Sequence, residues 1–117
     1  MEQYPLVYRC ALAIKPQQPF LDWLNEIDPV DNPTLQELRQ DSSLYLIPDY
    51  EDADDIDNAI QKYLRLNYTG IFINELSEWY VDPKMYPPFS YETFLKWFEI
   101  STHTMIYDTV NKPIQKE

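Results

Sequence analysis

Few side chains in the sequence have the chemistry of a nucleophile or a general base. His103 is the one imidazole and Cys10 is the one thiol. A Cys–His pair would require these two side chains to meet on the same face of neighbouring strands. Ser101, His103 and Asp108 supply the residue types of a triad, but no glycine-flanked turn or oxyanion loop accompanies them. A histidine on a strand is more often a surface residue, so we assign no catalytic residue.

A pair of carboxylates is the second group that could move a proton. Glu75 and Glu78 are three residues apart, which on a helix places them on one face. Glu75 follows Phe72 and precedes Leu76, so its burial among apolar residues would raise its pKa and suit it to acid–base work. Most acids on helices are solvated instead. A small enzyme that uses His103 or Glu75 is therefore an alternative function.

The composition of the 117-residue chain excludes several classes of site. One cysteine cannot form an internal disulfide, and one histidine with one cysteine falls short of the roughly four ligands of a structural zinc site. One glycine is too few for a dinucleotide-binding or phosphate-binding loop, because each needs several glycines for close backbone approach. We expect no cofactor and no bound metal.

The formal charge of −11 is concentrated in one part of the chain. Residues 22–57 contain 12 acidic residues and one basic residue, Arg39, whereas the rest of the chain holds equal numbers of each. Such acidity argues against direct binding of nucleic acid or of an anionic membrane. The densest run, called the acidic segment below, comprises Asp49, Glu51, Asp52, Asp54, Asp55 and Asp57.

The acidic segment has a structural and a functional interpretation. Carboxylates in the first turn of a helix interact favourably with its N-terminal partial charge, and a solvated acidic face is the commoner reason for such a run. However, the segment holds more acids than capping requires, and dense like charge opposes folding. The functional interpretation is a docking surface for a basic protein. An EF-hand is not indicated, because Ile56 follows Asp52-x-Asp54 at the next ligand position.

Aromatic residues are concentrated in residues 79–98. A small domain must bury large side chains to be stable, so we expect core packing, with Phe94 and Phe98 facing inward. Tyrosine and tryptophan are also enriched at binding hot spots, and the prolines of residues 81–88 would stiffen a peptide-binding groove. The residues expected to be more exposed there, and to contact a partner, are Tyr80, Tyr86 and Tyr91.

The strands that would position these groups can be predicted from the spacing of apolar residues. Residues 6–14 and 100–110 alternate as strands do, and the apolar run within 43–47 predicts a strand covered on both faces. Two alanines, Ala11 and Ala13, on the second face of the first strand would let another element approach closely, so that strand is predicted to be internal. We expect a small, mainly antiparallel sheet of about three strands.

Four or five short helices should pack on that sheet. Amphipathic spacing or capping residues predict helices over residues 19–27, 34–40 and 90–97. Another helix should begin near Asp52 and kink or break near Gly70, since glycine costs about 1 kcal/mol against alanine inside a helix. The fold class is therefore α+β. We expect a single domain over residues 1–117, with a frayed tail at 111–117.

The compartment can be argued from absent targeting signals. The sequence contains no apolar segment that approaches the roughly 20 residues of a membrane helix. The first residues include an acid and lack the basic region of a signal peptide. One cysteine in an apolar strand suits a reducing environment. We predict a cytoplasmic protein with no membrane partner.

Motifs over most of the chain also carry a resemblance. They are Pro16-x-x-Pro19-Phe20-x-x-Trp23-Leu24, Tyr45-Leu46-Ile47-Pro48, Glu75-Leu76-x-x-Trp79, and Trp97-Phe98 followed by His103-x-Met105-x-Tyr107-Asp108. In these motifs the chain resembles an uncharacterised family of small acidic bacterial proteins of unknown function, although it is richer in tyrosine and asparagine. The resemblance implies a single α+β domain and no particular activity, cofactor or catalytic residue.

The leading functional hypothesis is a non-enzymatic protein-interaction module. Its acidic face would steer and dock a basic partner. The first alternative is an inhibitor that mimics nucleic acid, with carboxylates where phosphates would lie. It depends on the same charges. The small enzyme described above is the second alternative.

Overall fold

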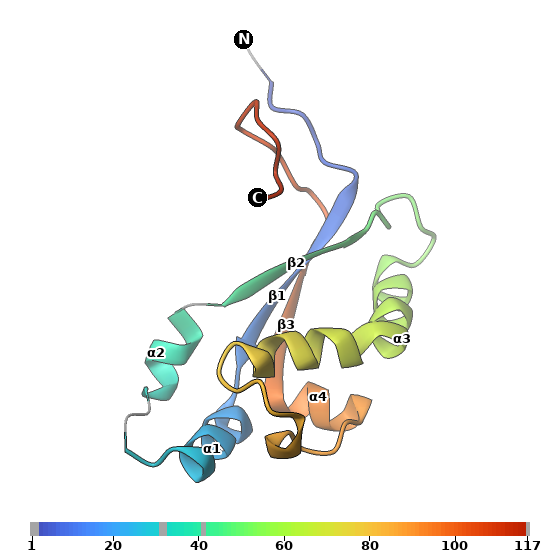
Figure 1. The fold of residues 1–117 in the computed structure, drawn as a ribbon. Coiled ribbons are helices and arrows are strands. Elements are labelled where there is room, and N and C mark those ends of the chain that lie inside the picture. The colour runs from blue at the N-terminus through green and yellow to red at the C-terminus, as the bar shows by residue number, and fades with distance from the viewer. Residues whose placement is uncertain (1–2, 31–32, 41, 117) are drawn as a thin grey trace.

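The computed structural model describes residues 3–30, 33–40 and 42–116, and these form an α+β fold. Its sheet has three antiparallel strands in the order β2-β1-β3, as predicted. The strands are β1 (Arg9–Pro16), β2 (Ser43–Pro48) and β3 (Phe98–His103). Figure 1 shows the helices gathered around one end of this sheet, while the two terminal segments extend from the other end.

The central strand β1 is buried on both faces, which confirms that it is internal. Cys10, Leu12 and Ile14 point into the main core and have no exposed surface. Ala11 and Ala13 point to the opposite face and are also buried. Ala11 pairs with Leu46 on one side and His103 on the other, so longer neighbours surround its small side chain.

The edge strand β2 differs from its prediction. We expected both faces of the apolar run to be covered, but Leu44 and Leu46 are 65% and 44% exposed. Ile47 is buried and Tyr45 is half-buried on the other face. The strand therefore has one core face and one exposed face, as antiparallel strands commonly do.

Strands β1 and β3 are shorter than the alternation predicted, and their bounds are shifted. β1 begins at Arg9, because the Arg9 amide donates to the Val7 carbonyl at 2.8 Å in a tight turn. Beyond this turn, Leu6 and Tyr107 form an isolated antiparallel bridge. β3 begins directly after a helix at Phe98 and ends at His103, short of residue 110. Residues 111–116 form no helix or strand, and Glu117 lies outside the described residues.

Four α-helices pack with the sheet in the described part of the chain. They are α1 (Gln18–Ile27), α2 (Leu35–Gln40), α3 (Ile56–Ser77) and α4 (Tyr91–Trp97), with a 3-10 turn at Pro83–Met85. The Thr34–Glu37 capping box precedes α2 as predicted, with Thr34 Oγ1 accepting from the Glu37 amide at 3.2 Å. Ser90 likewise caps α4 by accepting from the Thr93 amide at 3.0 Å.

The longest helix, α3, is neither short nor broken. It begins after Asp55, later than predicted, because the Asp55 side chain accepts a hydrogen bond from the Asn58 amide. It then runs through Gly70 without interruption. Figure 1 shows α3 changing direction along its length. The side chain of Asn67 donates to the Tyr63 carbonyl at 2.8 Å, and such a side-chain bond inside the backbone ladder is a recognised cause of bending.

The core is an aromatic cluster between the helices and the sheet. Phe72 of α3 has no exposed surface, and its ring centre lies 5.1–5.7 Å from those of Phe89, Phe94, Trp97 and Phe98. Phe94 and Phe98 are buried as predicted. Most of the aromatic residues of segment 79–98 therefore stabilise the fold, each large ring contributing roughly 1.5–3 kcal/mol when buried.

Candidate functional site

The most unusual group in the described part of the chain is a buried carboxylate. Glu75, near the end of α3, is 6% exposed and, in residues 3–30, 33–40 and 42–116, is the only polar or charged side chain that is buried. Its Oε1 accepts a hydrogen bond from Ser43 Oγ at 3.1 Å, and its Oε2 accepts one from the Tyr45 hydroxyl. Glu75 is therefore buried, which is the less common of the two cases that the sequence left open.

The two donors to Glu75 come from alternate positions of β2. Ser43 and Tyr45 are two residues apart, so their side chains share the face of β2 that meets α3. Asn74, the neighbour of Glu75, donates from Nδ2 to the Tyr45 oxygen at 2.8 Å. The Tyr45 hydroxyl therefore accepts from Asn74 and donates to Glu75, which fixes the direction of the chain of hydrogen bonds.

Burial changes the proton affinity of both partners. Loss of hydration raises the pKa of Glu75, and the nearby Glu78 carboxylate raises it further, while the hydrogen bonds from Tyr45 and Ser43 act in the opposite direction. Burial and the adjacent Glu75 also raise the pKa of Tyr45. Tyr45 consequently stays a neutral donor, and burial disfavours the charged form of Glu75.

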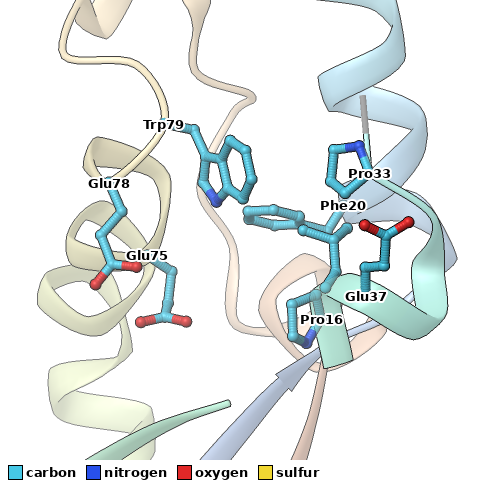
Figure 2. A pocket seen from close by; sticks show the side chains of 8 residues that line it. Pro16, Phe20, Pro33, Glu37, Glu75, Glu78 and Trp79 are labelled. Carbon is cyan, nitrogen blue, oxygen red and sulfur yellow. The ribbon is translucent and has the colours of Figure 1, made fainter. Parts of the chain in front are cut away.

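Glu75 lines a pocket of about 360 Å³ between α1, α2 and the end of α3. Phe20, Leu38 and Trp79 form apolar walls together with two prolines. Figure 2 shows Glu75 and Glu78 on the α3 side, Glu37 on the α2 side, and the Phe20 and Trp79 rings between them. The pocket thus combines aromatic surface with three carboxylates.

The other chemical candidates do not form a complete catalytic set in the described residues. His103 is exposed and pairs with Ala11, so it points away from the face that carries the buried Cys10. Ser101 Oγ lies 3.2 Å from His103 Nε2, but both residues are exposed. Asp108 accepts from the Val110 amide at 2.9 Å within a turn. The two alternatives that the sequence raised, a Cys–His pair and a Ser–His–Asp triad, are therefore not assembled.

The acidic segment occupies the loop between β2 and α3 and the first turn of α3 (Figure 1). The pocket is lined by residues at the other end of α3. All six of its carboxylate residues are exposed. Asp49 accepts from the Glu51 amide at 3.1 Å, and Asp55 caps α3. Between them Tyr50 anchors the loop, since its amide donates to Cys10 Sγ at 3.3 Å and its ring packs against Tyr63.

The three tyrosines singled out from the sequence are half-buried at the margin of the core. Tyr80 and Tyr86 pack against Trp23, with ring centres 5.8 and 6.5 Å away, and the Tyr86 hydroxyl donates to the Tyr80 carbonyl at 2.6 Å. Tyr91 stacks near Arg65, whose guanidinium carbon is 5.2 Å from the ring centre. These residues are more exposed than Phe94 and Phe98, but each contributes to packing.

Two further features bear on function. No helix in the described residues has the length and apolar character needed to cross a membrane. Nor do residues 3–30, 33–40 and 42–116 bring three His, Cys, Asp or Glu side chains together in a group that could hold a metal ion. Asp31 and Asp41, two of the acids counted in residues 22–57, lie outside the described residues.

Comparisons with protein-family models, with curated proteins and with solved structures found no match. The resemblance to a family of small acidic bacterial proteins therefore stays a prediction.

The sequence pointed to Glu75 but not to its surroundings. Its position between apolar residues was the signal for burial. Tyr45, Ser43 and Glu37 carried no such signal, because their approach to Glu75 or its pocket depends on how β2 and α2 are placed against α3. Trp79 belonged to the aromatic segment, and only its place at the end of α3 shows that it lines the pocket.

Proposed function

We propose that the protein is a non-enzymatic interaction module that docks a basic protein on the acidic segment. The observation that carries this proposal is that the six carboxylate residues are exposed and lack compensating cations. Among the described residues, no ion pair joins a basic side chain to any of them. Their mutual repulsion opposes folding, and a basic partner would relieve it.

The anchoring of the loop supports the same proposal. Tyr50 fixes the start of the acidic segment to β1 and α3, and Asp55 fixes its far part to the first turn of α3. Carboxylates on a loop held at both points are presented with less loss of conformational freedom on binding. The N-terminal partial charge of α3 is positive, so it holds the nearest carboxylates in place but does not neutralise the segment.

The test compares two pairs of neutralised carboxylates. The double variant Asp52→Asn/Asp54→Asn removes two charges from the acidic segment, and Glu26→Gln/Glu92→Gln removes two exposed charges elsewhere. Each protein is immobilised, exposed to host lysate and eluted with a salt gradient. The partner is then purified and its association rate is measured with all three proteins.

A basic protein should elute from the wild type and from the Glu26/Glu92 variant at moderate salt. The Asp52/Asp54 variant should lower its association rate constant by about tenfold, within the range of electrostatic steering. Equal association with all three proteins would refute the proposal. If the captured protein binds nucleic acid and duplex DNA competes for it, the nucleic-acid mimic replaces the simpler docking module.

A further inference from the structure

The pocket at the end of α3 has a one-sided electrostatic character. Among the described residues, its ionisable lining residues are Glu37, Glu75 and Glu78, and none of the lining residues is basic. It also lies beside the carbonyl end of α3, a 22-residue helix, where the backbone dipoles add partial negative charge. Both sources of charge favour a cation in the pocket.

The shape of the site favours an organic cation over a metal ion. The carboxylates are not grouped closely enough, among the described residues, to coordinate one metal. Figure 2 shows Glu75 and Glu37 on opposite sides, with the rings of Phe20 and Trp79 between them. Aromatic faces attract ammonium groups and also pack against apolar chains. A volume of about 360 Å³ is near the lower end of known ligand pockets and suits a small molecule or a single side chain.

Glu75 is the group that would hold the charged head. It is more than nine-tenths buried, and each of its oxygens receives one hydrogen bond from the protein. A carboxylate oxygen can accept two hydrogen bonds, so capacity remains for an N–H donor. Both hydrogen bonds to Glu75 are donated by the protein, as a charged carboxylate requires. A bound cation would offset the hydration that the carboxylate loses on burial.

We propose that this pocket binds a small organic ammonium ion, with its charged head against Glu75 and its apolar part against Phe20 and Trp79. The ammonium group belongs either to a free amine or to a lysine side chain of another protein. The site shares no residue with the acidic segment, so it stands independently of the docking function proposed above.

The experiment titrates the full chain with n-butylammonium and with n-butanol, a neutral compound of similar size, and follows backbone amide NMR shifts. Butylammonium should shift amides around Phe20, Glu75 and Trp79. Butanol should bind at least about tenfold more weakly, because it cannot pair with a buried carboxylate. Equal binding of the two compounds, or no shift near the pocket, would overturn the proposal.

Substitutions then test whether Glu75 and Trp79 bind the ammonium ion. Glu75→Gln should weaken butylammonium binding by at least about tenfold, whereas the exposed control Glu26→Gln should leave it unchanged. Trp79 is 44% exposed, so Trp79→Leu keeps the proposal testable if Glu75→Gln fails to fold. It should weaken binding severalfold by removing the aromatic face. Unchanged binding in a folded Glu75→Gln variant, or in Trp79→Leu, would refute the assignment.

Two further measurements distinguish a free amine from a lysine side chain, and the pocket from the acidic segment. N-acetyl-lysine methylamide carries the same ammonium group on a peptide-like body. Binding as tight as that of butylammonium assigns the pocket to a lysine side chain, and much weaker binding assigns it to free amines. Asp52→Asn/Asp54→Asn should leave butylammonium binding unchanged. A loss of binding in that variant would show that general negative charge, and not the pocket, attracts the cation.

Discussion

The hydroxyl of Tyr45 donates a hydrogen bond to the buried carboxylate of Glu75, thirty residues further along the chain. This contact joins the edge strand β2 to the last turns of α3. Asn74 completes it by donating to the Tyr45 oxygen. Because the carboxylate is buried, the stability of this junction depends on the proton that Glu75 binds.

The first prediction concerns the pH dependence of stability. Burial raises the pKa of Glu75 above its ordinary value of 4.5, so between that pH and the raised pKa the folded state keeps a proton that the unfolded state has lost. The contribution of Glu75 to the free energy of unfolding therefore falls as pH rises through the raised pKa. Glu75→Gln cannot titrate, so the wild type should lose stability relative to this variant as the pH rises above 4.5 and through the raised pKa.

Urea unfolding at a series of pH values measures this difference. Glu26→Gln is the control, because it removes one exposed carboxylate and so reports the effect of net charge alone. As the pH rises, the free energy of unfolding of the wild type should fall more steeply relative to that of Glu75→Gln than relative to that of Glu26→Gln. A constant difference between the wild type and Glu75→Gln across the pH range would contradict the assignment of a buried, titrating Glu75.

The second prediction concerns Tyr45. Tyr45→Phe removes the donor to Glu75 Oε2 and the acceptor for Asn74, so it should destabilise the fold by about 1–3 kcal/mol. It should also raise the pKa of Glu75 further, since the Tyr45 hydrogen bond stabilises the charged form. Urea unfolding measures the first effect and a carbon NMR titration measures the second. Tyr8→Phe, at a residue 81% exposed, is the matched change and should cost almost nothing.

The third prediction concerns the start of α3. Asp55 accepts a hydrogen bond from the Asn58 amide, so Asp55→Ala should destabilise the protein by about 1 kcal/mol. Asp54→Ala removes the same charge from an exposed neighbour that does not cap the helix. Thermal or urea unfolding should separate the two variants. If both change stability equally, charge repulsion and not capping controls this end of the helix.

The fourth prediction concerns Gly70. It lies inside α3 on an exposed position, and a β-carbon there would meet no atom within 4 Å. Its φ angle is not in the left-handed region. Gly70→Ala should therefore stabilise the protein by about 1 kcal/mol through the higher helix propensity of alanine. A lower midpoint of thermal unfolding would show that the bend of α3 depends on glycine.

Local patterns allowed much of the fold to be predicted. The capping residues Thr34 and Ser90 mark helix starts because their hydrogen bonds reach only three residues along the chain. The alanines of β1 marked the central strand because small side chains fit between two neighbours. The start of α3 was harder to place, since several acids of the acidic segment could have served as its cap.

Relationships between distant segments could not be predicted in the same way. The exposure of Leu44 and Leu46 follows from the edge position of β2, and an apolar run looks the same at an edge and in a covered strand. Glu75 could be suspected of burial, but its donor Tyr45 depends on the placement of β2 against α3. β3 ends at His103 because β1, its one neighbour, turns at Arg9 and offers no further residues to pair with.

The pairing of Ala11 with His103 also affects how the chain folds. Both outer strands pair with β1 alone, and β3 is about ninety residues away from it along the sequence. Closing such a distant pair costs considerable chain entropy, and contacts of this kind slow folding. During synthesis, β1 emerges first and must wait for β3. Until then one edge of this apolar strand presents unpaired N–H and C=O groups to other chains, so the protein is most prone to aggregation before residue 103 has left the ribosome.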